Sequence, residues 1–421
     1  MLPEKLANCR RDPDLSRDFQ VFVKPAGPAC NLGCIYCYYS GKAAPPQNGA
    51  PLLMDDGLLE AIIVQQIAAS TDEIIRFSWH GGEPTLAGLD FYRRAIDLQR
   101  RHKPAGRIIR NGLQTNGVLL DDSWGRFLAE AEFSIGLSLD GPAGFHDRLR
   151  RFRDGRPTHD RALRGFEILK RHGVATDILC VVHADNAGHP SDVYGFFKSI
   201  GAAFISFLPL VERRADAARG VSPESVSAAV WGSFLRAVFD EWLAGDIGRI
   251  KVQIFEEAAR TAFGQEHSLC LFRPVCGGSP VVERNGDFYP CDHFVRPELR
   301  LGNIRETSLA DLIDSPAQQS FGLAKAGTLP RICRACPVLA MCNGECPKNR
   351  FLMSSEGEAG LNYLCAGYKD FFSHCRPFVE AVASEWRRGN PQGPASALES
   401  AGRASAKSGS PRIPGRRNKK S

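Results

Sequence analysis

The sequence lacks a hydrophobic run long enough to cross a membrane. No stretch of about 18 apolar residues occurs in the chain, and a membrane-spanning helix needs about 20. The opening residues, MLPEKLANCRRDPDL, carry charges and contain no apolar core of the kind that secretion signals have. We therefore expect a cytoplasmic chain that does not enter a membrane.

A strong surplus of one charge is also missing. The formal net charge is +6, and part of it comes from the basic residues of segment 389–421. The rest of the chain is closer to neutral, so composition gives no reason to expect a nucleic-acid partner. Segment 389–421 is rich in Gly, Pro, Ser, Ala, Lys and Arg, which predicts a disordered basic tail.

Strand-like runs alternate with helical patterns up to about residue 250. This alternation is typical of βαβ units and a parallel sheet, so the predicted fold class is α/β. Six units indicate a partial (β/α)6 barrel rather than a closed eightfold one. The predicted strands are 19–24, 74–79, 107–114, 133–139, 176–183 and 203–210, and the predicted helices between them are 55–70, 88–101, 121–132, 160–172 and 190–200.

The pattern changes after residue 250. A hairpin is predicted around Asn285-Gly286, one helix over 308–322 and a last helix over 366–388. Because cysteines are dense here and apolar residues few, we expect a small domain that folds around metal. The predicted organisation is an N-terminal extension 1–18, a partial barrel 19–250, a cysteine-rich domain 251–388 with its terminal helix, and the tail 389–421.

Fourteen cysteines in a cytoplasmic chain indicate metal binding rather than disulfides. Cys30, Cys34 and Cys37 follow the first predicted strand with the spacing Cys-x3-Cys-x2-Cys. Three thiolates hold three irons of a four-iron cluster and leave the fourth iron open to a small ligand. Zinc is the alternative. Cys9, Cys180 and Cys375 stand apart and are interpreted as small buried apolar residues.

A second group of eight cysteines lies in the C-terminal region. Eight thiolates complete two four-cysteine clusters, and they would equally satisfy two zinc sites. The group consists of Cys270, Cys276, Cys291, Cys333, Cys336, Cys342, Cys346 and Cys365.

The three-cysteine loop resembles that of the radical S-adenosylmethionine (SAM) superfamily. His80-Gly81-Gly82-Glu83-Pro84 follows the second strand and resembles the segment that binds the methionine amino group in that family. The resemblance implies that Gly81, Gly82 and Glu83 bind or orient the cofactor. It also implies that Ser138, at the end of the fourth strand, contacts the methionine carboxylate. Arg150 is either a second carboxylate partner or a surface charge.

The C-terminal cysteines resemble the SPASM extension found in radical enzymes that modify peptides. The resemblance implies two auxiliary 4Fe-4S clusters in addition to the radical SAM cluster. By that similarity, Cys270, Cys276, Cys291 and Cys346 hold the first auxiliary cluster, and Cys333, Cys336, Cys342 and Cys365 hold the second.

Within the superfamily the chain resembles the anaerobic sulfatase-maturating enzymes over residues 19–375. The segments CNLGCIYCYY, SWHGGEPTLAG, FISFLPLVER, YPCDHF and CRACPVLAMCNGECPKNRF carry the similarity. It implies an oxidoreductase that uses a 5′-deoxyadenosyl radical to oxidise a Cys or Ser side chain of an unfolded sulfatase to Cα-formylglycine. A flavodoxin or ferredoxin is the electron donor that it implies.

Asp292, directly after Cys291, matches the proposed base of these enzymes. Burial beside an anionic cluster predicts a raised pKa for this carboxylate. Tyr39 either contacts the substrate or packs over the cluster, and His80 borders the substrate space. His146, Asp147, His183 and Trp79 are interpreted as structural.

Three other functions compete with this interpretation. One is a SPASM enzyme that forms thioether or other crosslinks in a different peptide, although only about 18 residues precede the first predicted strand, and such enzymes often carry a leader-binding domain there. The second is a non-catalytic iron–sulfur redox protein, which would not need six βα units or the Gly-Gly-Glu-Pro segment. The third is a zinc-binding scaffold.

Overall fold

The computed structural model describes residues 19–39, 53–214, 216–217 and 220–389. The predicted extension 1–18 lies outside the described residues, as does the predicted tail apart from Gly389. None of the helices in the described ranges has the length and apolar content needed to span a membrane.

A ten-stranded sheet forms the centre of the described structure, in the order β10-β9-β8-β1-β2-β3-β4-β5-β6-β7. Neighbouring strands from β1 to β7 are parallel, which confirms the predicted partial α/β barrel. The strands are β1 (Phe22–Val23), β2 (Ile74–Trp79), β3 (Ile108–Thr115), β4 (Phe133–Ser138), β5 (Ala175–Val182), β6 (Phe204–Pro209), β7 (Lys251–Val252), β8 (Val281–Val282), β9 (Asp287–Tyr289) and β10 (Gly302–Asn303).

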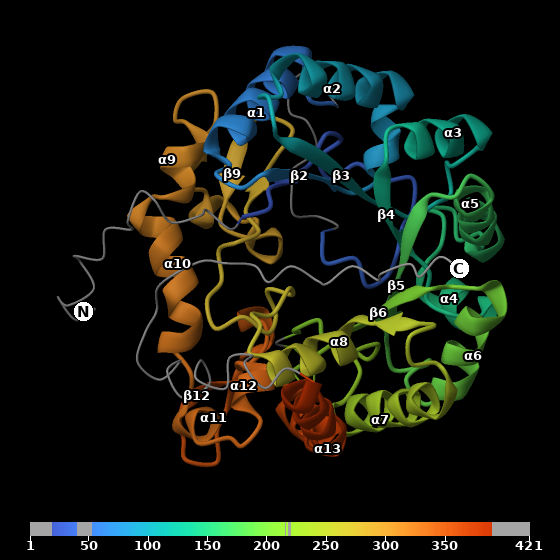
Figure 1. Cartoon of the computed structure of the whole chain (residues 1–421), viewed down its shortest axis with the longest axis vertical. Helices are drawn as coiled ribbons and strands as arrows, with labels where there is room; N and C mark the ends of the chain where they lie inside the picture. The colour runs from blue at the N-terminus through green and yellow to red at the C-terminus, as the bar shows by residue number, and fades with distance from the viewer. Residues whose placement is uncertain (1–18, 40–52, 215, 218–219, 390–421) are drawn as a thin grey trace, which may run out of the picture.

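Helices line the outer side of the curved sheet (Figure 1). Apolar residues on their inner faces pack on the strands, and the buried core includes Trp79, Tyr92 and Trp231. These helices are α1 (Asp56–Ala69), α2 (Leu89–His102), α3 (Asp122–Glu130), α4 (Ala143–Leu149), α5 (His159–Arg171), α6 (Pro190–Ile200), α7 (Ala228–Gly245) and α8 (Gln253–Arg260).

Most predicted elements agree with the structure to within two residues, and β2 agrees at both ends. The first predicted strand, 19–24, is shorter than expected, because only Phe22–Val23 pairs as a strand. The predicted single helix 308–322 is wrong. It is two helices, since Pro316 cannot continue a preceding helix and Ser315 caps a new one by accepting a bond from the Gln318 amide.

The C-terminal region is joined to the barrel at both edges. On one edge β8 pairs in parallel with β1, and the predicted hairpin β8–β9 turns at Asn285-Gly286. On the other, α13 packs along α7 (Figure 1). The remaining α-helices and strands of the described residues are α9 (Leu309–Ile313), α10 (Pro316–Gly327), α11 (Arg331–Arg334), α12 (Leu339–Cys342), β11 (Leu352–Met353), β12 (Ala359–Leu361) and α13 (Cys365–Gly389).

Candidate functional site

The loop with Cys30, Cys34 and Cys37 leaves the carboxyl end of β1. All three thiols are half-buried and none forms a disulfide. Burial raises the pKa of Cys30 to about 12, and the nearby charges of Cys34 and Cys37 add to the increase. The structure therefore places the three sulfurs near one another at the edge of the sheet where α/β folds build their active sites.

The Gly-Gly segment after β2 packs against this loop. The amide of Gly82 donates to the carbonyl of Gly27 at 2.8 Å, and the amide of Glu83 donates to that of Ala29 at 2.8 Å. A Cβ on Gly82 would lie 2.3 Å from the carbonyl oxygen of Ala29, which no real side chain tolerates. Glycine is therefore needed at position 82 for the backbone to approach the cysteine loop.

The carboxylate of Glu83 is buried and joins the ends of β2 and β3. It accepts bonds from the Thr85 amide at 3.0 Å, the Thr115 hydroxyl at 2.7 Å and the Asn116 amide at 2.8 Å. The side chain of Asn116 then reaches the sulfur of Cys30 at 3.9 Å. These contacts make Glu83 a residue that positions the loop.

Arg150 is buried beside Cys34, so the surface alternative for this residue is wrong. Its Nη1 donates to the hydroxyl of Tyr36 at 2.7 Å, and that hydroxyl donates to Asp140 at 2.5 Å. The Nε of Arg150 has no hydrogen-bond partner among the described residues. Ser138 ends β4, two residues before Asp140. A buried guanidinium with a free N–H is suited to a carboxylate ligand.

Asp292 is buried and forms an ion pair with Lys24, whose Nζ lies 2.5 Å from Oδ1. Tyr38 donates its hydroxyl to the other carboxylate oxygen. Burial acts to raise the pKa of Asp292, but the Lys24 ammonium, His80 and His293 together hold it well below its usual range. The predicted increase in this pKa is therefore wrong, because sequence analysis did not include Lys24.

Two further candidates border the Lys24–Asp292 pair. His80 stacks on Phe22 with ring centroids 4.3 Å apart, and burial together with Lys24 lowers its pKa to about 3. The imidazole is thus neutral at ordinary pH. Tyr39 donates its hydroxyl to Glu283, and Lys24 lies over its ring at 4.2 Å from the centroid. Tyr39 therefore belongs to the same buried network.

Four of the C-terminal cysteines influence one another electrostatically. Burial raises the pKa of Cys346, and the charges of Cys291 and Cys270 raise it further. Burial likewise raises the pKa of Cys291 to about 12, with contributions from Cys270 and Cys276. These four are the residues that sequence analysis groups as the first auxiliary set.

The other four form a second neighbourhood. Burial raises the pKa of Cys342 to about 12, and the charges of Cys365 and Cys333 contribute. Burial also raises the pKa of Cys365, with contributions from Cys333 and Cys336. Within the described residues, no three His, Cys, Asp or Glu side chains converge closely enough to hold a single metal ion.

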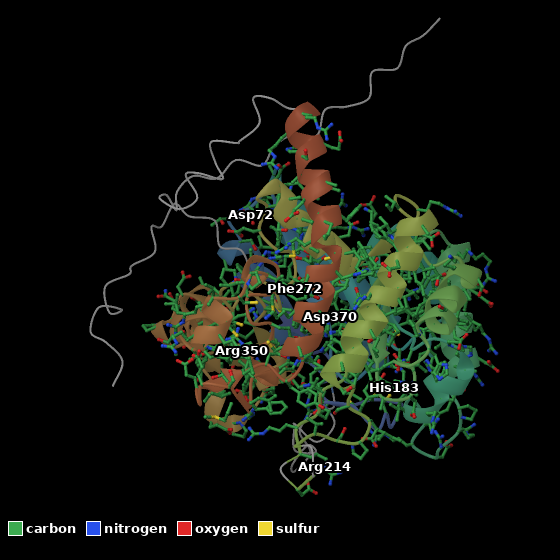
Figure 2. The ribbon with its side chains drawn as sticks, turned by 90° about the horizontal axis from the view of Figure 1, so that it is seen from below. Asp72, His183, Arg214, Phe272, Arg350 and Asp370 are labelled. Atoms are coloured by element: carbon green, nitrogen blue, oxygen red, sulfur yellow. The ribbon has the colours of Figure 1, made fainter. Side chains whose placement is uncertain are left out.

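A buried lysine and a half-buried arginine lie among these cysteines. Lys325 donates to the carbonyls of Cys270 and Leu271, each at 2.7 Å. Arg350 donates to the carbonyl of Gly344 at 2.8 Å and to that of Lys325 at 2.6 Å. Figure 2 shows Arg350 in the C-terminal part of the chain, where sulfur atoms gather. Neither cation was found from sequence, since lone basic residues in a cysteine-rich segment carry no distinctive pattern.

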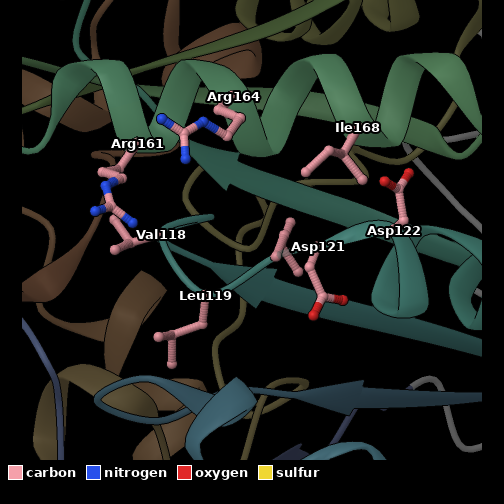
Figure 3. A pocket seen from close by; sticks show the side chains of 8 residues that line it. Val118, Leu119, Asp121, Asp122, Arg161, Arg164 and Ile168 are labelled. Atoms are coloured by element: carbon pink, nitrogen blue, oxygen red, sulfur yellow. The ribbon is translucent and has the colours of Figure 1, made fainter.

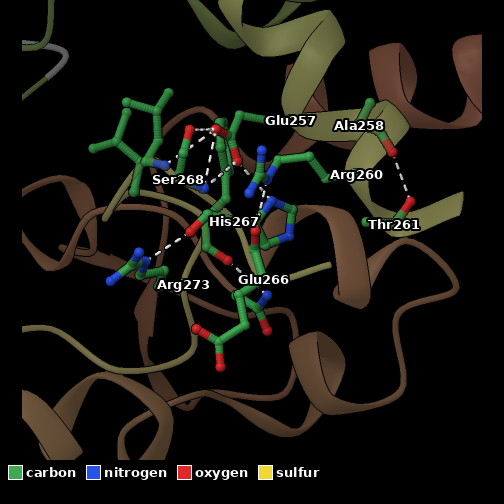
Figure 4. Close-up of polar contacts among 12 residues, drawn as sticks. Glu257, Ala258, Arg260, Thr261, Glu266, His267, Ser268 and Arg273 are labelled. Carbon is green, nitrogen blue, oxygen red and sulfur yellow. Dashed lines mark hydrogen bonds and ion pairs between the residues drawn. The ribbon is translucent and has the colours of Figure 1, made fainter. Parts of the chain in front are cut away.

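A buried carboxylate on α8 organises the segment that leads into Cys270. Glu257 accepts bonds from the Leu269 amide at 3.1 Å and from His267 Nδ1 at 2.9 Å (Figure 4). The other ring nitrogen of His267 lies 2.8 Å from the carbonyl of Ala340, close to Cys342. Glu257 thereby links the approaches to both C-terminal cysteine sets.

The residues interpreted as structural have structural contacts. His146 accepts a bond from the Asp140 amide at 3.2 Å, and Asp147 accepts from the amides at the start of α5. Trp79 donates its indole N–H to Asn111 at 2.9 Å within the core. Buried positions are likewise occupied by His183, Cys180 and Cys375. Cys9 lies outside the described residues.

A cavity of about 440 Å³, whose lining contains none of these cysteines, lies between α5 and the loop after β3. Arg161 and Arg164 extend from the helix toward Val118 (Figure 3). None of the candidate residues lines it, so it is not the site that the sequence predicts.

Two family models match the chain. Residues 25–197 match the radical SAM superfamily, and residues 274–337 match the SPASM iron–sulfur cluster-binding domain. The chain is 41% identical to the serine-type anaerobic sulfatase-maturating enzyme of Bacteroides thetaiotaomicron, over 91% of this chain and 95% of the relative. It is 32% identical to the cysteine-type enzyme of Clostridium perfringens strain 13, over 86% and 98%.

Solved structures of sulfatase-maturating and related enzymes are also similar to this chain. The structure described as native anSMEcpe with bound AdoMet and Cp18Cys peptide superposes with a TM-score of 0.79, at 32% identity, and covers 87% of this chain and 99% of that one. Streptococcus suis SuiB bound to its precursor peptide SuiA superposes at 0.59 with 17% identity, over 83% and 76% of the two chains, which shows a shared fold.

Proposed function

The chain belongs to the anaerobic sulfatase-maturating enzymes, and from this premise we propose that it oxidises a Cys or Ser side chain of a sulfatase to Cα-formylglycine. The observation that carries the proposal is the position of Asp292. This carboxylate follows Cys291 of the C-terminal region. It forms an ion pair with Lys24, which precedes the radical cysteine loop, and accepts a hydrogen bond from Tyr38, which follows Cys37. A base that removes the substrate's thiol or hydroxyl proton belongs at such a junction.

The donor sets suit iron–sulfur clusters. Cys30, Cys34 and Cys37 offer three thiolates for a 4Fe-4S cluster with an open iron, and the two C-terminal sets offer four each for the auxiliary clusters. When bound, the radical cluster and SAM together supply a 5′-deoxyadenosyl radical that takes hydrogen from the β-carbon of the substrate. The chain's own part is to hold both cofactors, orient the target side chain and accept its proton.

The SAM-binding roles are divided among residues around the cysteine loop. Gly81 and Gly82 bring backbone close to the ligand, whereas Glu83 positions the ends of β2 and β3 through its internal bonds. Ser138 and the free Nε of Arg150 bind the methionine carboxylate. These roles rest on the burial and contacts of each side chain together with its place at the carboxyl edge of the sheet.

Asp292 acts as the base in this proposal. The Lys24 ammonium in particular holds its pKa low, so the carboxylate is ionised at neutral pH, as a proton acceptor must be. Tyr39 and His80 border the same network, with His80 stacked on Phe22 at the end of β1. Their side chains shape the space next to the reacting group.

We further propose a serine target. Three relatives named serine-type are 40–41% identical to this chain, whereas three named cysteine-type are 28–33% identical. The remaining parts of the proposal are a flavodoxin or ferredoxin as electron donor and a cytoplasmic location, where thiols stay reduced for cluster assembly. The chain divides into a barrel, which the pairing of β7 (Lys251–Val252) with β6 carries just past the predicted boundary at residue 250, and an auxiliary-cluster region that follows it to residue 388.

The test is a peptide assay with the anaerobically reconstituted protein, dithionite and SAM. Two peptides that differ only in a Ser or Cys target are supplied, and mass spectrometry follows 5′-deoxyadenosine and the peptide mass. We expect both to change together, with the Ser peptide converted to formylglycine. The Cys34→Ala variant should produce no 5′-deoxyadenosine. If 5′-deoxyadenosine forms while neither peptide changes, the radical chemistry stands and the sulfatase substrate is wrong.

A further inference from the structure

An arginine-rich loop, residues 148–156, lies directly against the radical cysteine loop. The amide of Gly33 donates to the carbonyl of Arg151 at 2.8 Å, and the amide of Ile35 donates to that of Leu149 at 2.9 Å. Leu32 and Phe152 form an antiparallel bridge between the same segments. The arginine-rich loop is therefore an immediate neighbour of the residues between Cys30 and Cys37.

The exposed side chains of this loop are mainly cationic. It contains five arginines, of which only Arg150 is buried, and two of the exposed ones are paired. Arg156 pairs with Asp154 at 2.8 Å and Arg148 with Asp185 at 3.2 Å, so among the described residues the unpaired positive charges are those of Arg151 and Arg153. In the described structure, Arg151 donates to the carbonyl of Asp147 at 2.5 Å and Arg153 to that of Cys30 at 3.2 Å. Because carbonyls do not neutralise a guanidinium, positive charge remains at the surface beside the cysteine loop.

An exposed apolar residue stands beside these charges. Ile35 lies between Cys34 and Cys37, and 60% of its surface is accessible. This apolar side chain is therefore open to contact by a molecule that docks beside the cysteine loop. An apolar centre with a charged rim is the arrangement found in protein interfaces, where the rim charges guide encounter.

We propose that Ile35 and the arginine-rich loop are the docking surface for a small acidic one-electron carrier protein of the flavodoxin or ferredoxin class. The inference rests on the proposed function, which needs one electron delivered to the radical site for each SAM cleaved. At this surface one electron leaves the reduced carrier and enters the radical site, and no bond forms or breaks. The cationic rim complements an acidic carrier, and the contact places it against the cysteine loop itself.

The test separates docking from chemistry by changing the reductant. The double variant Arg148→Glu/Arg151→Glu alters two side chains that contact Asp185 and the Asp147 carbonyl rather than the cysteine loop. Reconstituted variant and wild-type enzymes are compared with dithionite and with purified, enzymatically reduced flavodoxin. We expect the KM for flavodoxin to rise at least tenfold, while the dithionite-driven rate stays within twofold of wild type.

Binding is measured separately from turnover. The Kd of oxidised flavodoxin for the enzyme should rise at least tenfold in the variant, and wild-type binding should weaken steeply between low and physiological salt. The matched control is Arg100→Glu/Arg101→Glu, which reverses the same charge at exposed positions on the last turn of α2. That turn lies at the sheet edge opposite the cysteine loop, so the control should bind flavodoxin normally.

Three results would overturn the proposal. Equal losses with flavodoxin and dithionite would mean that the loop acts on the radical site itself. Unchanged flavodoxin binding would mean that the carrier docks elsewhere. A rise in KM for the sulfatase peptide with no change for flavodoxin would make the substrate the occupant of this surface. If the wild-type enzyme formed no 5′-deoxyadenosine with dithionite, the proposed function itself would be wrong. The dithionite reaction therefore distinguishes a failure of the proposed function from a failure of the docking proposal.

Discussion

Lys24, directly after the first strand of the barrel, and Asp292, in the C-terminal region, form a buried ion pair with 2.5 Å between Nζ and Oδ1. A charge pair withdrawn from water depends on both partners, because either one left alone is a buried unpaired ion. The pair thus joins the two parts of the chain at the point where Tyr38 also reaches Asp292.

We expect Lys24→Met to lower the free energy of unfolding by about 3–5 kcal/mol, the usual cost of breaking a buried ion pair from one side. The double variant Lys24→Met/Asp292→Asn should regain much of that loss, since no charge is then left unpaired. Urea unfolding of the anaerobic protein, followed by far-UV circular dichroism, gives the comparison. Additive losses in the double variant would show that the two residues do not depend on each other.

The same carboxylate is expected to act on the substrate. Asp292→Asn keeps the shape of the side chain and removes its ability to accept the target's proton, so 5′-deoxyadenosine should still form while formylglycine falls at least a hundredfold. Mass spectrometry of both products from one reaction measures the ratio. Tyr38→Phe serves as the comparison, because it removes one hydrogen bond to Asp292 and leaves the carboxylate. Wild-type formylglycine yield from Asp292→Asn would exclude this residue as the base.

The site was predicted best where its residues follow one another in the chain. The three-cysteine spacing and the Gly-Gly-Glu-Pro segment are local patterns. The strand Ile74–Trp79 was predicted at both ends because its β-branched and aromatic residues are bounded by turn-forming residues. The contact from Tyr38 to Asp292 joins residues 254 positions apart. No local pattern reports such a contact, so the ion pair and the low pKa of Asp292 became visible only in the fold.

Arg150 illustrates the same limit in another way. An arginine among several arginines is usually exposed, and the sequence left a surface position and a ligand-binding position equally open. The fold decides between them because the guanidinium is buried and Tyr36, on the cysteine loop, accepts a hydrogen bond from it. For Glu83 the sequence motif was recognised, but the contacts of its carboxylate were not. Those contacts join the end of β2 to the end of β3, so they depend on the two strands lying side by side.

Gly82 should tolerate no side chain. In Gly82→Ala the new Cβ would lie 2.3 Å from the carbonyl of Ala29, so the cysteine loop must shift. We expect at least a tenfold loss of 5′-deoxyadenosine formation and weaker SAM binding, measured by equilibrium dialysis of the reconstituted protein. Gly144→Ala, in α4, is the matched control, because nothing lies within 4 Å of its added methyl group. Normal SAM binding in Gly82→Ala would mean that the loop has room to adjust.

Glu257 should contribute stability that depends on pH. Burial acts to raise the pKa of Glu257, but its bonds with His267 and Ser268 lower the pKa below the ordinary value of 4.5. A carboxyl whose pKa is lower in the folded state stabilises the fold above its unfolded pKa, and this contribution is lost as the pH falls through the folded value. The stability difference between wild type and Glu257→Gln should therefore be largest near pH 7 and shrink below about pH 4.5. Urea unfolding at a series of pH values measures it, and a difference independent of pH would contradict the ionic role.

Lys325 should set the reduction potential of the first auxiliary site. Its ammonium is buried, donates to the carbonyl of Cys270, and lies close enough for the thiolates of Cys270, Cys276 and Cys346 to affect its pKa. A fixed positive charge stabilises the more reduced, more negative state of a cluster, so Lys325→Met should move the potential of that site to a more negative value. A redox titration followed by electron paramagnetic resonance measures the potential of each site separately.

Lys369→Met is the comparison, because this lysine is exposed beside Cys365 of the second set and solvent screens its charge, so its effect should be smaller. An unchanged potential in Lys325→Met would mean that the backbone amides, rather than this buried cation, control the first auxiliary site.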